Sequence, residues 1–314
     1  MTEARTPVEQ CRFSVVIPTH GRPDALRRAV DSVLAQTITD LEVIVVDDAG
    51  VPSAPVFQDA RVTVLRQPLN GGVSAARNRG AEAARAEWIA FLDDDDLWYP
   101  RRLEAISAVL EEIDGERHTI VTTDLEVQDD GHVTHLYSQE RPFEAEDQLL
   151  QSILRPFLTV MFVVHADLLR EVGGFDEQLR SAEDADLLSR LLLAGGRVHL
   201  VDEPLARYNR GDGRTRDRAL TWVGKLLWLE KLAQRDDLGP REAEAVAQTL
   251  VDTRLRLLRL RAIHAVDADD SRRPFLAAAA TLSGLSWRIR LLLVARAVLP
   301  ERWFARLPRS GRTA

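Results

Sequence analysis

Several features that would define a protein class are scarce or missing in this chain of 314 residues. The single cysteine, Cys11, excludes a disulfide framework and a four-thiolate zinc site. Only two lysines are present, Lys225 and Lys231, and no GxxxxGK segment occurs, which excludes a P-loop nucleotide site. No strand-like run is followed by GxGxxG, so a dinucleotide-binding fold is disfavoured.

Long hydrophobic runs are also missing. The start of the chain, MTEARTPVEQ, has no apolar core of a signal peptide, and no stretch of 18 apolar residues is free of charge. These absences predict a cytoplasmic protein without a membrane-spanning helix. Hydrophobic residues still make up 45% of the chain, which is enough for a full core and excludes wholesale disorder.

The net charge of −8 is spread unevenly along the chain. Residues 251–314 contain 13 arginines and 5 acidic residues, a net charge of +8, so the first 250 residues carry −16. An acidic body binds nucleic acid poorly, because neutralising phosphates requires lysine and arginine. We therefore expect no nucleic-acid partner, and an anionic ligand would need a local basic pocket or a bound cation.

Strand-like and helix-like segments alternate over the first half of the chain. Short apolar, β-branched runs predict strands, and an apolar stripe that begins after Pro23 and Asp24 predicts a helix. This alternation is typical of a parallel sheet flanked by helices, an α/β fold. The expected strands are 13–17, 41–46, 61–65 and 88–92, and the second helix is 73–84.

The pattern is less regular in the rest of the chain. From about residue 215 the chain reads as helical to its end, with breaks near 239–240, 271–274 and Pro300. The sequence therefore predicts helices appended to an α/β domain. Between the two regular parts we expect strands at 120–123, 161–165 and 197–201, a hairpin turn at 129–131 and a helix at 184–194.

Three of the predicted strands end in polar residues. They are followed by Pro18-Thr19-His20, by Asp47-Asp48 and by the run Asp93 to Asp96. Ligands of parallel sheets bind beyond the carboxyl ends of the strands. We therefore expect the functional site where these three segments meet.

The four adjacent carboxylates of Asp93 to Asp96 are the strongest of these signals. Hard carboxylate oxygens at a strand end suit Mg²⁺ or Mn²⁺. In an extended chain Asp93 and Asp95 face one way and Asp94 the other, which gives metal ligands on one side and a hydroxyl acceptor on the other. The alternative interpretation is a solvated acidic loop, or an N-cap for the helix after Pro100.

A Mg²⁺ ion held by carboxylates usually binds phosphates. Without a P-loop, arginines would complete the phosphate site, and the candidates are Arg22, Arg77 and Arg79, although each alone is more typical of a solvated surface. Asp48 can accept the imide N–H of a pyrimidine base, or a carboxylate of the Asp47-Asp48 pair can cap the next turn. The residues alone leave both interpretations open.

Several segments, in this order, resemble family 2 glycosyltransferases with the GT-A fold. The resemblance covers about residues 12–210 and implies a Rossmann-like, mostly parallel sheet flanked by helices, here with a C-terminal helical extension. It also implies an enzyme that uses a nucleotide-sugar donor and a divalent metal, Mg²⁺ or Mn²⁺. The segments are FSVVIPTHGRPDALRRAVDSVLAQTITDLEVIVVDDAG, LNGGVSAARNRGAEAARAEWIAFLDDDDLWYPRRLE, GGFDE and EDADLLSRLLLAGG.

The resemblance implies roles for individual residues. Asp184 would be the catalytic base, and Asp95 and Asp93 would hold the metal. Two departures from the family pattern stand out: His20-Gly21 replaces the common Tyr-Asn, and no histidine follows Tyr208. The donor nucleotide would be bound by Pro18, Thr19, His20, Arg22, Asp48, Arg77 and Asp94, and the acceptor side would be lined by Gly174, Phe175, Asp176, Glu183 and Trp98.

The implied reaction is an inverting sugar transfer. The metal and the arginines stabilise the nucleotide-diphosphate leaving group, and Asp184 takes the proton of the acceptor hydroxyl. From the residues alone, Asp184 can equally cap the helix that it precedes. Two other functions stay open, a non-catalytic nucleotide-sugar-binding protein and a DxD phosphotransferase. The phosphotransferase motif needs a threonine or valine at the position where this chain has Leu97.

The predicted organisation is a tail over 1–11, a catalytic domain over 12–214 and a helical extension over 215–314. The catalytic domain would have a nucleotide-binding half, 12–97, and an acceptor half, 98–214. UDP is the nucleotide that the family uses most, and its acceptors include glycans, lipid-linked glycans and small molecules. For the extension we consider three roles: packing against the catalytic domain, formation of a homodimer, and peripheral contact with the inner face of an anionic membrane. Of the last two, we expect the homodimer.

Overall fold

The computed structural model describes residues 11–129, 132–137, 147–154, 162–210 and 218–267. The chain divides into two compact units, residues 1–249 and 250–314, and the sheet lies in the first. This boundary falls inside the last described helix rather than at residue 214. Most of the predicted N-terminal tail, and the breaks expected at 271–274 and Pro300, lie outside the described residues.

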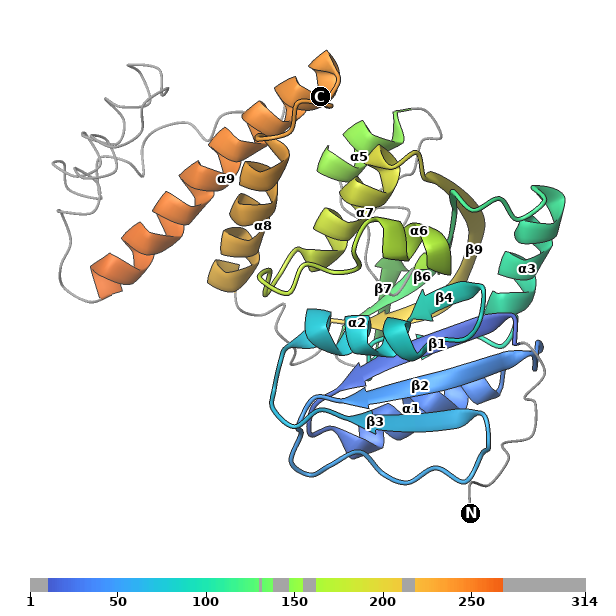
Figure 1. Ribbon diagram of the computed structural model, residues 1–314. Helices are drawn as coiled ribbons and strands as arrows, with labels where there is room; N and C mark the ends of the chain where they lie inside the picture. Colours follow the sequence, from blue (N-terminus) through green and yellow to red (C-terminus); the bar gives the residue numbers. More distant parts are fainter. Residues whose placement is uncertain (1–10, 130–131, 138–146, 155–161, 211–217, 268–314) are drawn as a thin grey trace, which may run out of the picture. The chain divides into compact units, whose positions relative to one another are not determined.

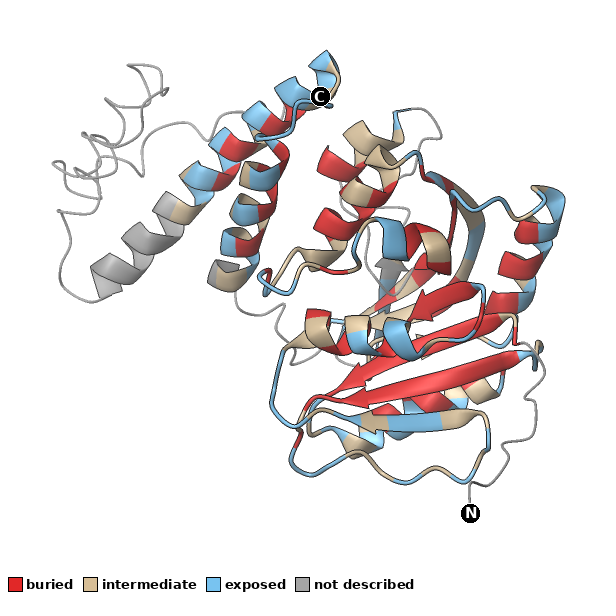
Figure 2. Cartoon of the chain, viewed as in Figure 1, coloured by how far each residue is buried: buried red, intermediate tan, exposed pale blue. Residues whose placement is uncertain are grey.

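The first four strands form the parallel half of the sheet, as the sequence predicts (Figure 1). Every residue of β1, β2 and β4 is buried, which explains why these segments are apolar runs without alternation (Figure 2). Their order in the sheet is β3-β2-β1-β4. The four strands are β1 (Phe13–Thr19), β2 (Leu41–Asp47), β3 (Val62–Arg66) and β4 (Trp88–Phe91).

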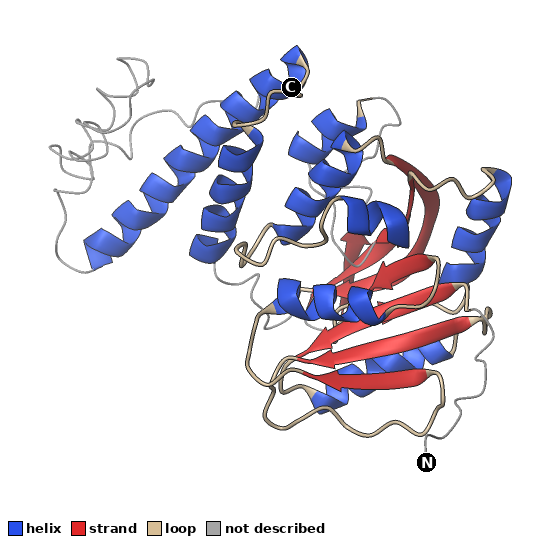
Figure 3. Cartoon of the chain, viewed as in Figure 1, coloured by secondary structure: helices blue, strands red, loops and turns tan. Residues whose placement is uncertain are grey.

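Helices α1 (Pro23–Leu34) and α2 (Val73–Ala83) cover opposite faces of these strands (Figure 3). Helix α1 begins at Pro23, whose fixed φ suits the first turn, and its apolar stripe is buried. Helix α2 packs closely on β1 through Gly80. A Cβ atom at Gly80 would lie 2.3 Å from Val16 Cγ1, so this position admits no side chain without movement.

The second half of the sheet mixes strand directions. Strand β8 (Phe162–His165) is antiparallel to β4 and to β6 (Thr119–Asp129), and β6 is parallel to β9 (Arg197–Asn209). Strand β7 (His132–Leu136) is antiparallel to β6, which confirms the predicted hairpin, and the two-residue β5 (Leu97–Trp98) is antiparallel to β9. Strands β6 and β9 are longer than predicted, because their pairing continues past register shifts on either side of Asp124.

Of the remaining helices, α3 (Arg102–Glu112) and α6 (Ala166–Glu171) pack on strands of this second half. Helix α7 matches the helix predicted at 184–194, and α5 has no counterpart among the predictions. Within the described part of the chain, no helix has both the length and the apolar character needed to cross a bilayer. The other remaining helices are α5 (Gln148–Leu154), α7 (Glu183–Leu193), α8 (Arg218–Leu232) and α9 (Pro240–Asp267).

Candidate functional site

The polar ends of β1, β2 and β4 meet at one edge of the sheet, because the three strands are parallel and adjacent. Thr19 at the end of β1 stands opposite Asp47 at the end of β2. The Thr19 hydroxyl donates a 2.6 Å hydrogen bond to Asp94, in the acidic run after β4. The structure therefore brings together the three segments that the sequence predicts to form a site.

The Asp47-Asp48 pair holds the loops that follow β2 and β3. Asp47 accepts hydrogen bonds from two backbone N–H groups of the loop after β2, at 2.8 and 2.9 Å, so it has the turn-capping role. Asp48 is 3% exposed and accepts from the N–H groups of Gly71, at 2.7 Å, and Gly72, at 2.9 Å. The exposed His20 lies beside it, with Nδ1 2.8 Å from the Asp48 carbonyl oxygen. Binding of a base by Asp48 stays a prediction.

The acidic run is a tight turn and not an extended chain. The Asp96 N–H donates a 3.1 Å hydrogen bond to the Asp93 carbonyl oxygen, which closes the turn. The side chains still separate into two groups. Asp94 turns toward Thr19, whereas one carboxylate oxygen each from Asp93, Asp95 and Asp96 lie within 4.8 Å of one another.

The group of three carboxylates fits a hard divalent cation. Asp96 is 1% exposed, and its Oδ1 atom accepts from the Asn209 N–H at 2.8 Å. Its Oδ2 atom is buried and has no hydrogen-bond donor among the described residues. Burial, together with the charges of Asp93 and Asp95, raises the pKa of Asp96 well above its ordinary value. A buried oxygen without a donor, beside two further carboxylates, is a donor set that suits Mg²⁺ or Mn²⁺.

Arg22 brings positive charge to the outer side of the turn. Its side chain is 44% exposed, and its guanidinium group lies 2.5 Å from Asp95 and 3.2 Å from Asp94. Burial raises the pKa of Asp94 to about 6, although Thr19 and Arg22 oppose the rise. Arg22 is therefore a partly exposed cation at the edge of the cluster of aspartates, where an anionic ligand can reach it.

Arg77 is a buried bridge between two acidic segments. Its side chain is 3% exposed, and its guanidinium group donates to Asp93 at 2.6 Å and to Glu183 at 3.0 Å. It also lies 5.2 Å from the centre of the Phe175 ring. Burial alone would lower the pKa of Arg77, but Asp93 and Glu183 outweigh it and raise the pKa overall. Arg77 is thus not a solvated arginine, whereas Arg79 is one. Binding of a diphosphate by Arg77 stays a prediction.

Asp184 lies in the first turn of α7 and does not cap it. The N-cap residue is Ala182, in the left-handed conformation with φ 61°. The Asp184 carboxylate accepts from the Ala185 N–H at 2.8 Å. Burial, and then the charge of Glu183, raise the pKa of Asp184 to about 7, against the opposing effect of Arg77. A carboxylate whose pKa is close to the working pH is suited to general-base catalysis.

The GGFDE segment is a loop held from helix α2 by Asn78. The Asn78 side chain donates to the Phe175 carbonyl oxygen at 2.9 Å and accepts from the Phe175 N–H at 2.7 Å. Gly174 has φ 68°, and a Cβ atom there would lie 2.6 Å from Asn78 Oδ1, so the position requires glycine. The loop is therefore fixed to the same helix that carries Arg77.

Two residues predicted to face an acceptor are buried instead. Trp98 is 3% exposed and packs under the Arg102 guanidinium group, 4.9 Å from the ring centre. Phe175 is also 3% exposed and meets Phe91 edge to face at 5.0 Å. Neither ring presents a surface to an acceptor, which corrects the prediction. An aromatic residue after a polar turn looks the same in sequence whether it faces the core or a ligand.

Sequence reasoning also missed three residues of the site. Asn78 lies between two arginines in ARNRG, a context that gives no sign of its hydrogen bonds to the loop. Asp96 belongs to the acidic run, but no role was predicted for it. Asn209 at the end of β9 meets the turn only because β9 pairs with β6 and β5. The length of the acidic run was the one available signal.

Comparison with known proteins gives a consistent result. Residues 14–173 match the family model described as glycosyl transferase family 2. An uncharacterized glycosyltransferase of Haemophilus influenzae is 29% identical over 196 residues, which are 62% of this chain and 66% of that protein. The succinoglycan biosynthesis protein ExoW of Rhizobium meliloti is 34% identical over 228 residues, which are 64% of this chain and 69% of ExoW.

The fold is similar to that of S. aureus TarS. The TarS crystal structure has a TM-score of 0.64 and 18% sequence identity, over 91% of this chain and 52% of that one. TarS 1–349 in complex with UDP-GlcNAc has a TM-score of 0.56 and 19% identity, over 94% of this chain and 83% of that one. At this identity the likeness establishes the fold, a mixed sheet flanked by helices.

Proposed function

Because the chain belongs to glycosyltransferase family 2, we propose that it moves a sugar from a UDP-sugar to an acceptor hydroxyl, with inversion at the anomeric carbon. One observation carries the proposal. Arg77 bridges Asp93 and Glu183. The cluster of Asp93, Asp95 and Asp96 therefore lies on one side of a buried guanidinium group, and the start of α7 with Asp184 lies on the other. The proposed leaving-group site and the proposed general base would thereby be held together.

The donor would lie beyond the carboxyl ends of β1 and β2. His20 is exposed there, and Arg22 offers a partly exposed guanidinium group to a diphosphate. The choice of UDP is supported by TarS, a protein of similar fold that has been crystallised with UDP-GlcNAc.

Asp93, Asp95 and Asp96 would hold a Mg²⁺ or Mn²⁺ ion, as the buried Asp96 oxygen without a donor suggests. When bound there, the ion would stabilise the negative charge that develops on the diphosphate leaving group. Arg22 would add its own charge from the outer side of the turn. Asp94 would accept a hydrogen bond from a donor hydroxyl.

Asp184 would accept the proton of the acceptor hydroxyl while that oxygen attacks the anomeric carbon. The bond from this carbon to the diphosphate breaks as the new bond forms, and the nucleotide leaves with the bonding electron pair. Attack from the face opposite the leaving group inverts the anomeric centre. With its pKa raised to about 7, Asp184 is largely ionised at pH 8 and is then ready to take the proton.

Release of the nucleotide from a panel of UDP-, dTDP- and GDP-sugars tests the proposal. We expect Mn²⁺-dependent release of UDP from at least one UDP-sugar, with UDP-GlcNAc as the first donor. Asp184→Asn should lower kcat by at least about 10²-fold and leave donor KM nearly unchanged, because it removes the base but not the donor site. Asp167→Asn, a partly exposed aspartate of α6, is the matched control and should keep the wild-type rate.

Two outcomes would contradict parts of this proposal. A near wild-type rate for Asp184→Asn would show that the base is another group. Binding of a UDP-sugar without any turnover, by the wild-type chain and with every acceptor class tried, would favour a non-catalytic nucleotide-sugar-binding protein.

A further inference from the structure

Helix α8 touches the chain immediately before α7 through its backbone. Gly224 lies in α8, and a Cβ atom there would be 2.3 Å from the Ser181 carbonyl oxygen and 2.6 Å from the Ser181 carbonyl carbon. Backbone atoms cannot turn aside as a flexible side chain can. Any residue other than glycine at 224 would therefore separate α8 from the segment that leads into α7.

That segment has an unfavourable backbone conformation. Ala182 follows Ser181 and has φ 61°, which is disfavoured for a residue with a Cβ atom. Such a conformation persists only where the surroundings fix it. No side chain caps this end of α7. The close contact with Gly224 is therefore one of the interactions that fix the start of α7, the turn that carries Asp184.

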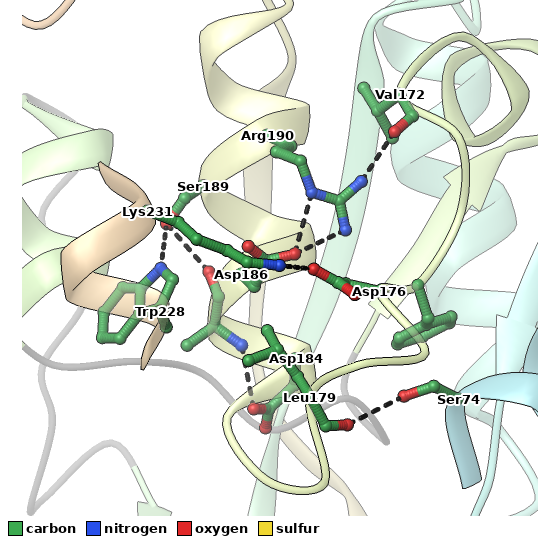
Figure 4. A network of polar contacts seen from close by, with 12 residues as sticks. Ser74, Val172, Asp176, Leu179, Asp184, Asp186, Ser189, Arg190, Trp228 and Lys231 are labelled. Atoms are coloured by element: carbon green, nitrogen blue, oxygen red, sulfur yellow. Dashed lines mark hydrogen bonds and ion pairs between the residues drawn. The ribbon is translucent and has the colours of Figure 1, made fainter. Parts of the chain in front are cut away.

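A second contact, one turn further along α8, reaches α7 about two turns from its start. Trp228 is fully buried, and its indole N–H donates to the Ser189 hydroxyl at 3.3 Å (Figure 4). The Ser189 hydroxyl donates in turn to the Ala185 carbonyl oxygen at 2.8 Å. Ala185 is the residue whose N–H is bonded to the Asp184 carboxylate. The chain of contacts thus runs from α8 to the residue next to Asp184.

A third contact ties α8 to the loop before α7. Lys231 forms an ion pair with Asp176 of the GGFDE segment, and Figure 4 shows its side chain extending past α7 to that carboxylate. The same segment is held on its other side by Asn78 of α2. Lys231 is 43% exposed, so the pair is accessible to substitution without opening the core.

From these three contacts we propose that helix α8 is a brace that sets the position of Asp184, with Gly224, Trp228 and Lys231 as positioning residues. The inference rests on the proposed role of Asp184 as the general base. Helix α8 would then contribute to the reaction only through the contacts of these residues with Ser181, Ser189 and Asp176. Displacing α8 would move the start of α7, and with it the base, whereas the turn of Asp93 to Asp96 keeps its own contacts with Thr19 and Asn209.

Gly224→Ala tests the brace, with Leu227→Ala on the 42%-exposed side of the same helix as the control. We expect Gly224→Ala to lower kcat for UDP release at least about 10-fold, because a displacement of about 1 Å can cost about 10²-fold. Donor KM and the Kd of UDP should stay within about twofold of wild type, since the donor side is untouched. Amide hydrogen exchange at 181–186 should become faster, and exchange in β1 and β2 should not change. Leu227→Ala should match wild type in all of these.

Lys231 provides a second test if Gly224→Ala fails to fold. Lys231→Met should lower kcat without changing donor KM, and Lys231→Arg, which keeps the ion pair with Asp176, should restore it. An unchanged kcat in both Gly224→Ala and Lys231→Met would overturn the inference, as would an equal loss in Leu227→Ala.

Asp184→Asn separates this inference from the proposed function. If Asp184→Asn is inactive and the α8 variants are fully active, the brace is refuted and the base stands. If Asp184→Asn is fully active, the proposed base is wrong, and the exchange rates at 181–186 alone decide whether α8 holds this end of α7.

Discussion

The carboxylates of the site differ in pKa because they differ in burial and in partners. Burial raises the pKa of Asp94 to about 6 and that of Asp184 to about 7, and it raises the pKa of Asp96 as well. Arg77 stands between Asp93 and Glu183 with both ends of its guanidinium group engaged. The buried carboxylates of the site therefore repel one another when ionised, and a bound cation or a proton would reduce this repulsion.

Asp184 should make folding stability depend on pH. Its folded-state pKa of about 7 exceeds the ordinary value of 3.8, so the folded protein binds the proton more tightly than the unfolded chain does. The free energy of unfolding should therefore fall as pH rises from about 4 to about 7, and stay reduced above that range. Asp184→Asn removes this cost. Thermal melts without added metal should show the variant gaining stability over wild type at pH 8 but not at pH 4. A difference in melting temperature that does not change with pH would contradict the assignment.

Arg77 should be important for stability, unlike its neighbour Arg79. Arg77→Ala leaves Asp93 and Glu183 without their shared cation and should lower the free energy of unfolding by about 3 kcal/mol, as breaking a buried ion pair typically does. Arg79→Ala, at a side chain that is 60% exposed, should change it by no more than about 0.5 kcal/mol. Urea unfolding of the two variants measures both. Equal effects would show that the Arg77 bridge does not stabilise the fold.

The two arginines also show what sequence reasoning could not resolve at this scale. They are two positions apart on α2, and base rates favour solvation for each. What separates them is which face of α2 meets the Asp93 turn and the start of α7, segments far away along the chain. Contacts with distant segments also decide that Trp98 and Phe175 point into the core, so local sequence could not predict it.

At the scale of elements, the close packing of α2 on β1 sets the place of Arg77 and Asn78. Gly80 is the contact point, since a Cβ atom there would lie 2.3 Å from Val16 Cγ1. Gly80→Ala gains up to about 1 kcal/mol of helix propensity but must push α2 away from the strand. We expect a net loss of about 1 kcal/mol or more in the free energy of unfolding, as overpacking usually costs. A variant at least as stable as wild type in urea unfolding would show that α2 can move freely.

The elements differ in how far local sequence predicts them. Strands β1, β2 and β4 are buried on both faces, and their uninterrupted apolar runs predict them within two residues. The partly exposed edge strand β3 is predicted within one residue from its β-branched run RVTVL. Strand β5 has two residues, too few for any periodicity. Strand β9 continues through Asp202, Glu203 and Pro204, residues typical of a strand end, because its partner β6 holds it across the shift in register. Pairing between distant segments decided these cases.

At the scale of the whole molecule, charge divides the chain. The first 250 residues carry −16 and residues 251–314 carry +8. Residues 268–314 lie outside the described part of the chain, so the predicted homodimer and membrane contact stay predictions. The acidic first 250 residues should weaken binding of the donor, because a nucleotide diphosphate brings further negative charge to a site that already holds Asp93 to Asp96. Binding of that ligand should therefore depend on a cation.

Calorimetric titration with UDP, in Mn²⁺ and again in excess EDTA, measures whether donor binding depends on a metal. We expect that UDP binds in Mn²⁺, that EDTA abolishes binding, and that Asp95→Ala abolishes it even with Mn²⁺ present, whereas Asp184→Asn binds as the wild type does. Binding of UDP with the same Kd in EDTA and in Mn²⁺ would contradict the claim that Asp93, Asp95 and Asp96 form a metal-dependent donor site.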